Sequence, residues 1–202
     1  DHIELRGARS VRRPNKLFWG DKFRSCVDDS SAEFMLVIHA DCKFGDWSAL
    51  VKRSVDVLSK NSQVGVWAPY IEWPSRPPRT TMINALKPGP FIFSAWTDSL
   101  VFALRRPIVE RMKSANYEEN IYGWGICYMF TACALSLGLL TIVDTSLKVI
   151  HRPGRGYPSD KAAEQREKFL QQLTPAESII NSLLSQIMER NKYILKTARK
   201  PG

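Results

Sequence analysis

The first residues able to do chemistry are His39 and Asp41, which directly follow the apolar run 34–38. An imidazole and a carboxylate one residue apart at the end of a buried strand can face one cleft and hold a divalent cation, which in turn neutralises a diphosphate. An aspartate at a strand end more commonly caps a helix or bonds within a loop. The triplet His39-Ala40-Asp41 therefore does not decide between a metal site and a structural role.

The second group is Tyr122-Gly123-Trp124-Gly125-Ile126-Cys127, which Glu118 and Glu119 precede. Two glycines around a tryptophan allow close backbone approach and hold a flat aromatic face against a ligand, which suits the apolar C–H face of a sugar ring. The structural alternative is a packed tryptophan in a turn. Glu118 and Glu119, taken singly, read better as solvated surface charges.

The third group is His151, Arg152, Arg155, Gly156 and Tyr157, at the exit of an expected strand. Imidazole can complete the coordination of a metal ion, and arginines bind phosphate oxygens through paired N–H donors. A single histidine after a strand is usually structural. The three groups carry more weight together, because each lies at a strand exit or in a loop that a ligand can reach.

The elements that must position these groups alternate between strand and helix. The continuous apolar run 34–38 predicts a central strand covered on both faces, whose C-terminal end lies at the edge where open α/β sheets bind ligands. Helical periodicity over 47–59 follows, and then a strand over 64–68. The expected apolar face of that helix consists of Leu50, Val51, Val55 and Leu58.

The middle of the chain continues as mixed α and β. Segment 72–90 holds five prolines and several arginines, which predicts a loop or lid with little regular structure. Further strands are expected at 91–93, 100–104, 139–143 and 146–150, and helices at 107–114 and 126–137.

The C-terminal part should be helical, with Thr174 as N-cap and Pro175 at the first helical position. The helix carries an apolar stripe, which predicts packing on the domain or on a sister subunit in a homodimer. Peripheral contact with a membrane is the alternative, and the basic residues near the C-terminus suit it. The stripe consists of Ile179, Ile180, Leu183, Leu184, Ile187 and Met188.

Composition limits the class of partner and the compartment. The 202 residues carry a formal net charge of +9, which favours a polyanionic partner. The basic residues are scattered in short clusters, so a phosphate pocket fits as well as nucleic acid, and we expect no specific nucleic-acid partner. Four cysteines without a C-x-x-C pair favour a reduced, cytoplasmic environment. Thr131, Ser136 and Gly138 interrupt the uncharged stretch 126–143, which argues against a membrane span.

Taken in order, these motifs resemble inverting A-type glycosyltransferases related to family 2. The resemblance runs from the strand before His39-Ala40-Asp41, through SAWTDSLVFALRR and YGWGI, to the H-x-x-G-R-G-Y segment, and covers roughly residues 34–157. It implies an α/β, Rossmann-like nucleotide-diphospho-sugar transferase fold with a mixed central sheet, here lacking its N-terminal strand or strands. The corresponding domains are 1–158 for the transferase domain and 159–202 for a C-terminal helical extension.

The resemblance also assigns roles at the donor side. The family's D-x-D motif would be His39-x-Asp41, and with His151 these residues would bind Mn²⁺ or Mg²⁺, although imidazole at position 39 departs from the pattern. The donor-binding residues would be Asp41, Arg152, Arg155 and Tyr157, and the acceptor-binding residues would be Trp96, Asp98, Gly123, Trp124 and Gly125.

The acidic base that commonly follows G-W-G in such enzymes is replaced here by Cys127. A thiol with a reference pKa of about 8.5 is a poor substitute for a carboxylate. Three explanations remain: an engineered substitution, a natural change in which Glu118 or Glu119 takes over, or an inactive relative. We favour a change that impairs catalysis.

The resulting hypothesis is a metal-dependent glycosyltransferase that moves a sugar from a nucleotide-diphosphate donor to a hydroxyl of a glycan or lipid-linked acceptor, with inversion. The alternative is a non-catalytic protein on the same fold that binds a glycan or an anionic membrane. Cys127 and His39 favour that alternative.

Overall fold

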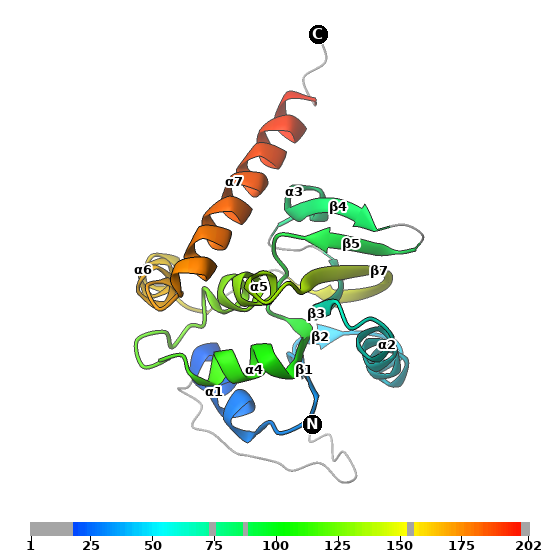
Figure 1. The fold of residues 1–202 in the computed structure, drawn as a ribbon, viewed down its shortest axis with the longest axis horizontal. Coiled ribbons are helices and arrows are strands. Elements are labelled where there is room, and N and C mark those ends of the chain that lie inside the picture. Colours follow the sequence, from blue (N-terminus) through cyan, green and yellow to red (C-terminus); the bar gives the residue numbers. More distant parts are fainter. Residues whose placement is uncertain (1–17, 73–75, 87–88, 153–155, 199–202) are drawn as a thin grey trace.

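The computed structural model describes residues 18–72, 76–86, 89–152 and 156–198, and within them one mixed sheet of seven strands organises the chain (Figure 1). The order is β1-β6-β3-β7-β5-β4, with β2 paired to β7. Strands β3 and β7 run parallel, and the other paired strands are antiparallel. The strands are β1 (Phe34–Ile38), β2 (Cys42–Lys43), β3 (Val64–Glu72), β4 (Met82–Leu86), β5 (Phe91–Ser94), β6 (Val101–Arg105) and β7 (Leu140–His151).

Helices cover both faces of this sheet. Side chains alternate between its faces, so Phe102 and Leu104 belong to one hydrophobic cluster while Val101 and Ala103 belong to another. Helix α2 packs in the second cluster, and α1, α4 and α5 pack in the first. The helices are α1 (Trp19–Asp29), α2 (Trp47–Lys60), α3 (Pro78–Thr81), α4 (Arg106–Lys113), α5 (Ile126–Ser136), α6 (Ser159–Leu170) and α7 (Pro175–Thr197).

Strand β1 has the predicted bounds but not the predicted central position. Within the described residues it lies at the end of the sheet and pairs only with β6. Both of its faces are nevertheless covered, because Met35 and Val37 pack with the α1, α4 and α5 cluster while Phe34 and Leu36 pack with the α2 cluster. An apolar run reports coverage of a strand's faces, and it carries no information on how many strands pair with it.

Three other expectations on local structure were wrong. The segment 72–90 contains β4, which pairs with β5. The two strands expected at 139–143 and 146–150 form the single strand β7. On α2 the buried face consists of Leu50, Ser54, Val57 and Leu58, whereas Val51 and Val55 are exposed.

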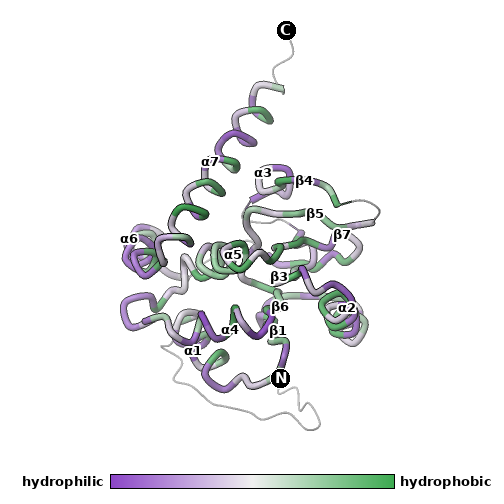
Figure 2. The backbone as a smooth tube through the Cα atoms, viewed as in Figure 1, coloured by the Kyte–Doolittle hydropathy of each residue, from purple (hydrophilic) through white to green (hydrophobic). Residues whose placement is uncertain are grey.

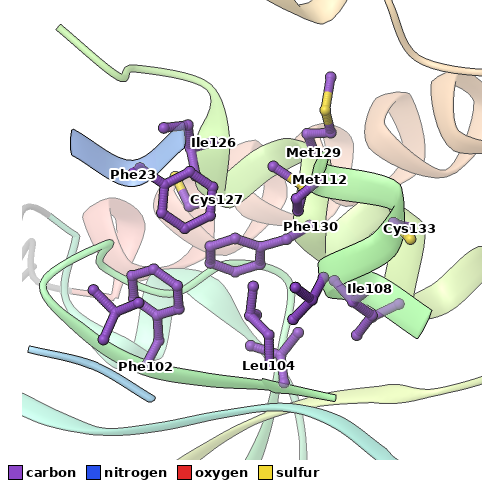
Figure 3. Packing of buried hydrophobic residues seen from close by; sticks show 14 of the residues in the cluster. Phe23, Phe102, Leu104, Ile108, Met112, Ile126, Cys127, Met129, Phe130 and Cys133 are labelled. Carbon is purple, nitrogen blue, oxygen red and sulfur yellow. The ribbon is translucent and has the colours of Figure 1, made fainter. Parts of the chain in front are cut away.

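The uncharged stretch after Gly125 is a core helix. Residues of α5 are buried on almost all sides, and Phe130 stacks on Phe102 of β6 with ring centroids 5.0 Å apart (Figure 3). Figure 2 accordingly shows α5 as predominantly hydrophobic, in contrast to α6. No helix among the described residues is long and apolar enough to cross a membrane.

Helix α7 begins as predicted at Thr174 and Pro175, with a complete capping box between Thr174 and Glu177. Both carboxylate oxygens of Glu177 also accept from the Arg111 guanidinium of α4, each at 2.8 Å. The helix packs against α5 and α3 and then extends beyond the sheet (Figure 1). Of the expected stripe, Leu184 and Met188 are buried, whereas Ile179 and Leu183 are exposed.

We predict that Glu177→Gln lowers the free energy of unfolding by about 2 kcal/mol at pH 7, because charge-assisted hydrogen bonds are lost. Burial alone would raise the pKa of Glu177, but the hydrogen bonds from Arg111 and from the Thr174 backbone lower it below its ordinary value. A carboxylate whose pKa is lowered on folding stabilises the folded state at pH values above its unfolded-state pKa of about 4.3. This stabilisation is lost as the pH falls through the folded-state pKa. The difference between wild type and variant in urea unfolding should therefore vanish in acid.

The matched control is Glu189→Gln on the exposed part of the same helix, which should leave unfolding unchanged. A Glu177→Gln protein as stable as wild type at pH 7 would contradict the anchoring role of the Arg111–Glu177 pair.

Candidate functional site

A cavity of about 390 Å³ brings together residues from each of the three sequence groups. Its wall comes from α1, from the segments after β1 and before β6, from the turn before α5, from the end of β7 and from α6. The lining residues are Trp19, His39, Asp41, Arg76, Trp96, Asp98, Ser99, Leu100, Tyr122, Gly123, Trp124, Gly125, Cys127, Tyr128, His151, Tyr157 and Arg166.

Strand pairing places Asp41 beside His151. Cys42 of β2 lies opposite His151 of β7 in the antiparallel register, so the residue before Cys42 is held at the end of β7. The Nε2 atom of His151 is 3.2 Å from Oδ2 of Asp41. Arg152 follows His151 but is exposed and does not line the cavity, and Arg155 lies outside the described residues.

His39 lines the same cavity behind this pair. Its ring packs against the indole of Trp19, with centroids 4.1 Å apart. Burial lowers the pKa of His39 to about 4, and the smaller opposing effect of Asp41 does not offset it. The imidazole is thus neutral near pH 7, and among the described residues its buried Nε2 atom has no hydrogen-bond partner.

The donor set at this end of the cavity is small. No group of three or more His, Cys, Asp or Glu side chains within the described ranges is arranged to hold a metal ion. Asp41 and His151 alone supply one carboxylate and one imidazole, both of which Mn²⁺ accepts. These two side chains could hold a cation that takes its remaining ligands from a diphosphate. The role of His39 as a ligand of the same cation stays a prediction.

The G-W-G turn is held in its conformation by two glycines with positive φ, 75° at Gly123 and 96° at Gly125. A Cβ atom at Gly123 would lie 2.4 Å from Cδ1 of Trp19, so the turn and α1 approach as closely as only glycine allows. Trp124 is thereby fixed at the cavity, and its Nε1–H donates to the hydroxyl of Tyr157 at 2.9 Å.

Tyr157 continues an aromatic wall at this side of the cavity. Its ring stacks on Tyr122 with centroids 4.7 Å apart and an interplanar angle of 18°, and Phe18 meets both rings edge-on. Flat aromatic faces of this kind suit the C–H surface of a sugar or the face of a base.

Cys127 is enclosed at the start of α5. Its Sγ atom accepts a hydrogen bond from Nε1 of Trp96 at 2.9 Å, and only 6% of the residue is exposed. Burial raises the pKa of the thiol to about 11, more than the hydrogen bonds from Ser99 and Trp96 lower it. The thiol is therefore neutral near pH 7 and a poor proton acceptor.

The glutamates expected as substitute bases lie outside the cavity. Glu118 and Glu119 are both exposed, and Glu119 pairs with Lys168 at 3.7 Å beside a second, separate cavity. Asp98, in contrast, lines the main cavity and is 8% exposed.

Sequence reasoning missed Arg76 in the proline-rich segment. Its guanidinium lies over the rings of Trp96 and Tyr128, at 5.4 and 5.5 Å from their centroids, and it donates to the Tyr128 hydroxyl and to the Met188 sulfur. These partners lie 52 and 112 residues away in sequence, so only the basic character of the segment signalled it.

We predict that Gly123→Ala destabilises the protein by about 2 to 4 kcal/mol, because a side chain at positive φ is strained and the Cβ atom overlaps Trp19. Gly45→Ala is the control, since nothing lies within 4 Å of its Cβ position. Urea unfolding of both variants measures the difference. Equal stability of the two would show that the turn does not need this close approach.

The comparisons with known proteins support the fold. No protein-family model and no curated protein matches the sequence. A solved structure of a mannosyltransferase from Pyrobaculum calidifontis in complex with GDP-Man and Mn²⁺ is similar, with a TM-score of 0.50 and 14% identity. The match covers 91% of this chain and 56% of that chain, so this chain spans little more than half of its length. The mixed sheet and this likeness give the chain an α/β, Rossmann-like fold similar to that of the mannosyltransferase.

Proposed function

We propose that this chain belongs to an enzyme that transfers a sugar from a nucleotide-diphosphate donor to a hydroxyl acceptor, with inversion. The observation that carries the proposal is the Asp41–His151 pair in a cavity that Trp124, Tyr122 and Tyr157 also line. A carboxylate and an imidazole can hold the divalent cation that neutralises a diphosphate, and flat aromatic side chains suit a sugar ring. The solved structure with a similar fold holds GDP-Man and Mn²⁺.

At the donor end, Asp41 and His151 would hold Mn²⁺ or Mg²⁺ and so orient the nucleotide diphosphate. The ion, when bound, stabilises the negative charge that develops on the diphosphate as it leaves. Arg152 follows His151 directly but does not line the cavity, so its contact with the phosphate oxygens, like that of Arg155, stays a prediction.

At the acceptor end, Trp124 and Trp96 position the acceptor on a glycan or lipid carrier. Both side chains are fixed by hydrogen bonds, Trp124 through Tyr157 and Trp96 through Cys127. Rigid aromatic groups hold the hydroxyl in line with the anomeric carbon, which is the main requirement of a single displacement.

The test is calorimetric titration of GDP and UDP into the protein with and without Mn²⁺. We expect Asp41→Asn to weaken Mn²⁺-dependent binding at least about tenfold, as loss of a metal-binding interaction typically does. The matched control is Asp56→Asn on α2, which removes a partly exposed carboxylate that does not line the cavity. Unchanged Mn²⁺-dependent binding by Asp41→Asn would remove Asp41 from the metal site.

A non-catalytic binding protein on the same fold is the second candidate, and the neutral, enclosed thiol of Cys127 favours it. The two functions differ in one assay, the release of nucleotide from a nucleotide sugar with and without Mn²⁺. Donor binding without any release would establish the binding protein and contradict the enzyme.

A further inference from the structure

The single displacement needs a group that accepts the proton of the attacking hydroxyl. Two carboxylates line the cavity within the described residues, those of Asp41 and Asp98. Asp41 is 3.2 Å from His151 in the pair assigned above to the diphosphate end. Asp98 is therefore the cavity carboxylate that the donor side does not use.

The position of Asp98 fits an acceptor-side role. It lies between β5 and β6, in the same short segment as Trp96, and this segment is fixed at its start because Oγ of Ser94 donates to the Trp96 carbonyl at 2.6 Å. Trp96 is fixed in turn by its bond to Cys127. A carboxylate on so constrained a segment is held in one place before substrate binds.

Asp98 shares its cavity with both groups that the transfer needs. The lining includes Gly123 and Trp124 of the G-W-G turn as well as Asp41 and His151, and Asp98 itself is 8% exposed. The acceptor oxygen must meet the anomeric carbon inside this same cavity.

We propose that Asp98 is the general base of the transfer, an inference that rests on the proposed function. The acceptor oxygen forms a bond to the anomeric carbon while the bond from that carbon to the diphosphate oxygen breaks, and its electron pair leaves with the diphosphate. The hydroxyl proton passes to the Asp98 carboxylate. Asp98 thus does the work that the resemblance assigns to the position of Cys127.

The test uses the whole protein, Mn²⁺ and a panel of GDP-, UDP- and dTDP-sugars, with water and simple sugars as acceptors. Asp98→Asn, which keeps the shape of the side chain, should lower nucleotide release by a factor of about 10² to 10⁴, the usual worth of a general base. Donor binding measured by calorimetry should stay within about threefold of wild type. Asp56→Asn is the matched control and should change neither quantity.

Nucleotide release by Asp98→Ala in the presence of sodium azide separates a general base from a residue with a purely structural role. Azide is already an anion, so it attacks the anomeric carbon without giving up a proton, and the variant should regain nucleotide release and form a glycosyl azide detectable by mass spectrometry. Asp41→Ala should not be restored in this way, because it lacks a donor-binding group rather than a base.

The failures of the two proposals are distinguishable. A wild-type protein that binds no donor of the panel, or binds one without releasing its nucleotide, overturns the proposed function and the role of Asp98 with it. A wild-type protein that turns over, with Asp98→Asn equally active, overturns the role of Asp98 alone. Loss of donor binding in Asp98→Asn, or no response of Asp98→Ala to azide, also overturns that role.

Discussion

The site depends on the short pairing of β2 with the end of β7. Two residues of β2 lie antiparallel to His151 and Ile150, and this contact folds the segment after β1 back across the sheet. Without it, Asp41 would follow an edge strand of the described sheet and His151 would end a strand three positions further along, separated from it by β6 and β3. The pairing converts two distant strand ends into one pair of side chains 3.2 Å apart.

A second constraint fixes the aromatic wall of the cavity. The N-terminal end of α1 packs directly against the turn before α5, where the Gly20 N–H donates to the Ile121 carbonyl and a Cβ at Gly20 would overlap the backbone of Asn120. This contact needs glycine on both sides, since Gly123 meets Trp19 in the same place. It also carries Trp19 onto His39, so the aromatic wall and the charged end of the cavity are coupled through one helix end.

Sequence alone predicted what local pattern controls and missed what distant contacts control. The bounds of β1 and the cap at Thr174 were right, because apolar runs and capping residues act within a few positions. The strand break expected near Asp144 is instead an irregularity in the pairing of the single strand β7 with β3. At this point Arg53, 91 residues away, pairs with the buried Asp144 carboxylate at 2.8 Å, a contact that no local pattern shows. The same limit explains Arg76, whose aromatic partners no local pattern could show. That His39, Asp41 and His151 meet in one cavity could be predicted, because they follow or end strands of one sheet. The roles of these residues stay predictions.

The thiol at position 127 and the carboxylate at position 98 are best understood together. Both line one cavity and both are largely enclosed, so an acid at 127 would face the charge of Asp98 in a site with little solvent to screen it. Two carboxylates so placed cannot both stay ionised, since each raises the pKa of the other. A neutral thiol that accepts the indole N–H of Trp96 removes this conflict. Under the proposal that Asp98 is the base, the cysteine marks a base that has moved along the cavity wall rather than one that has been lost.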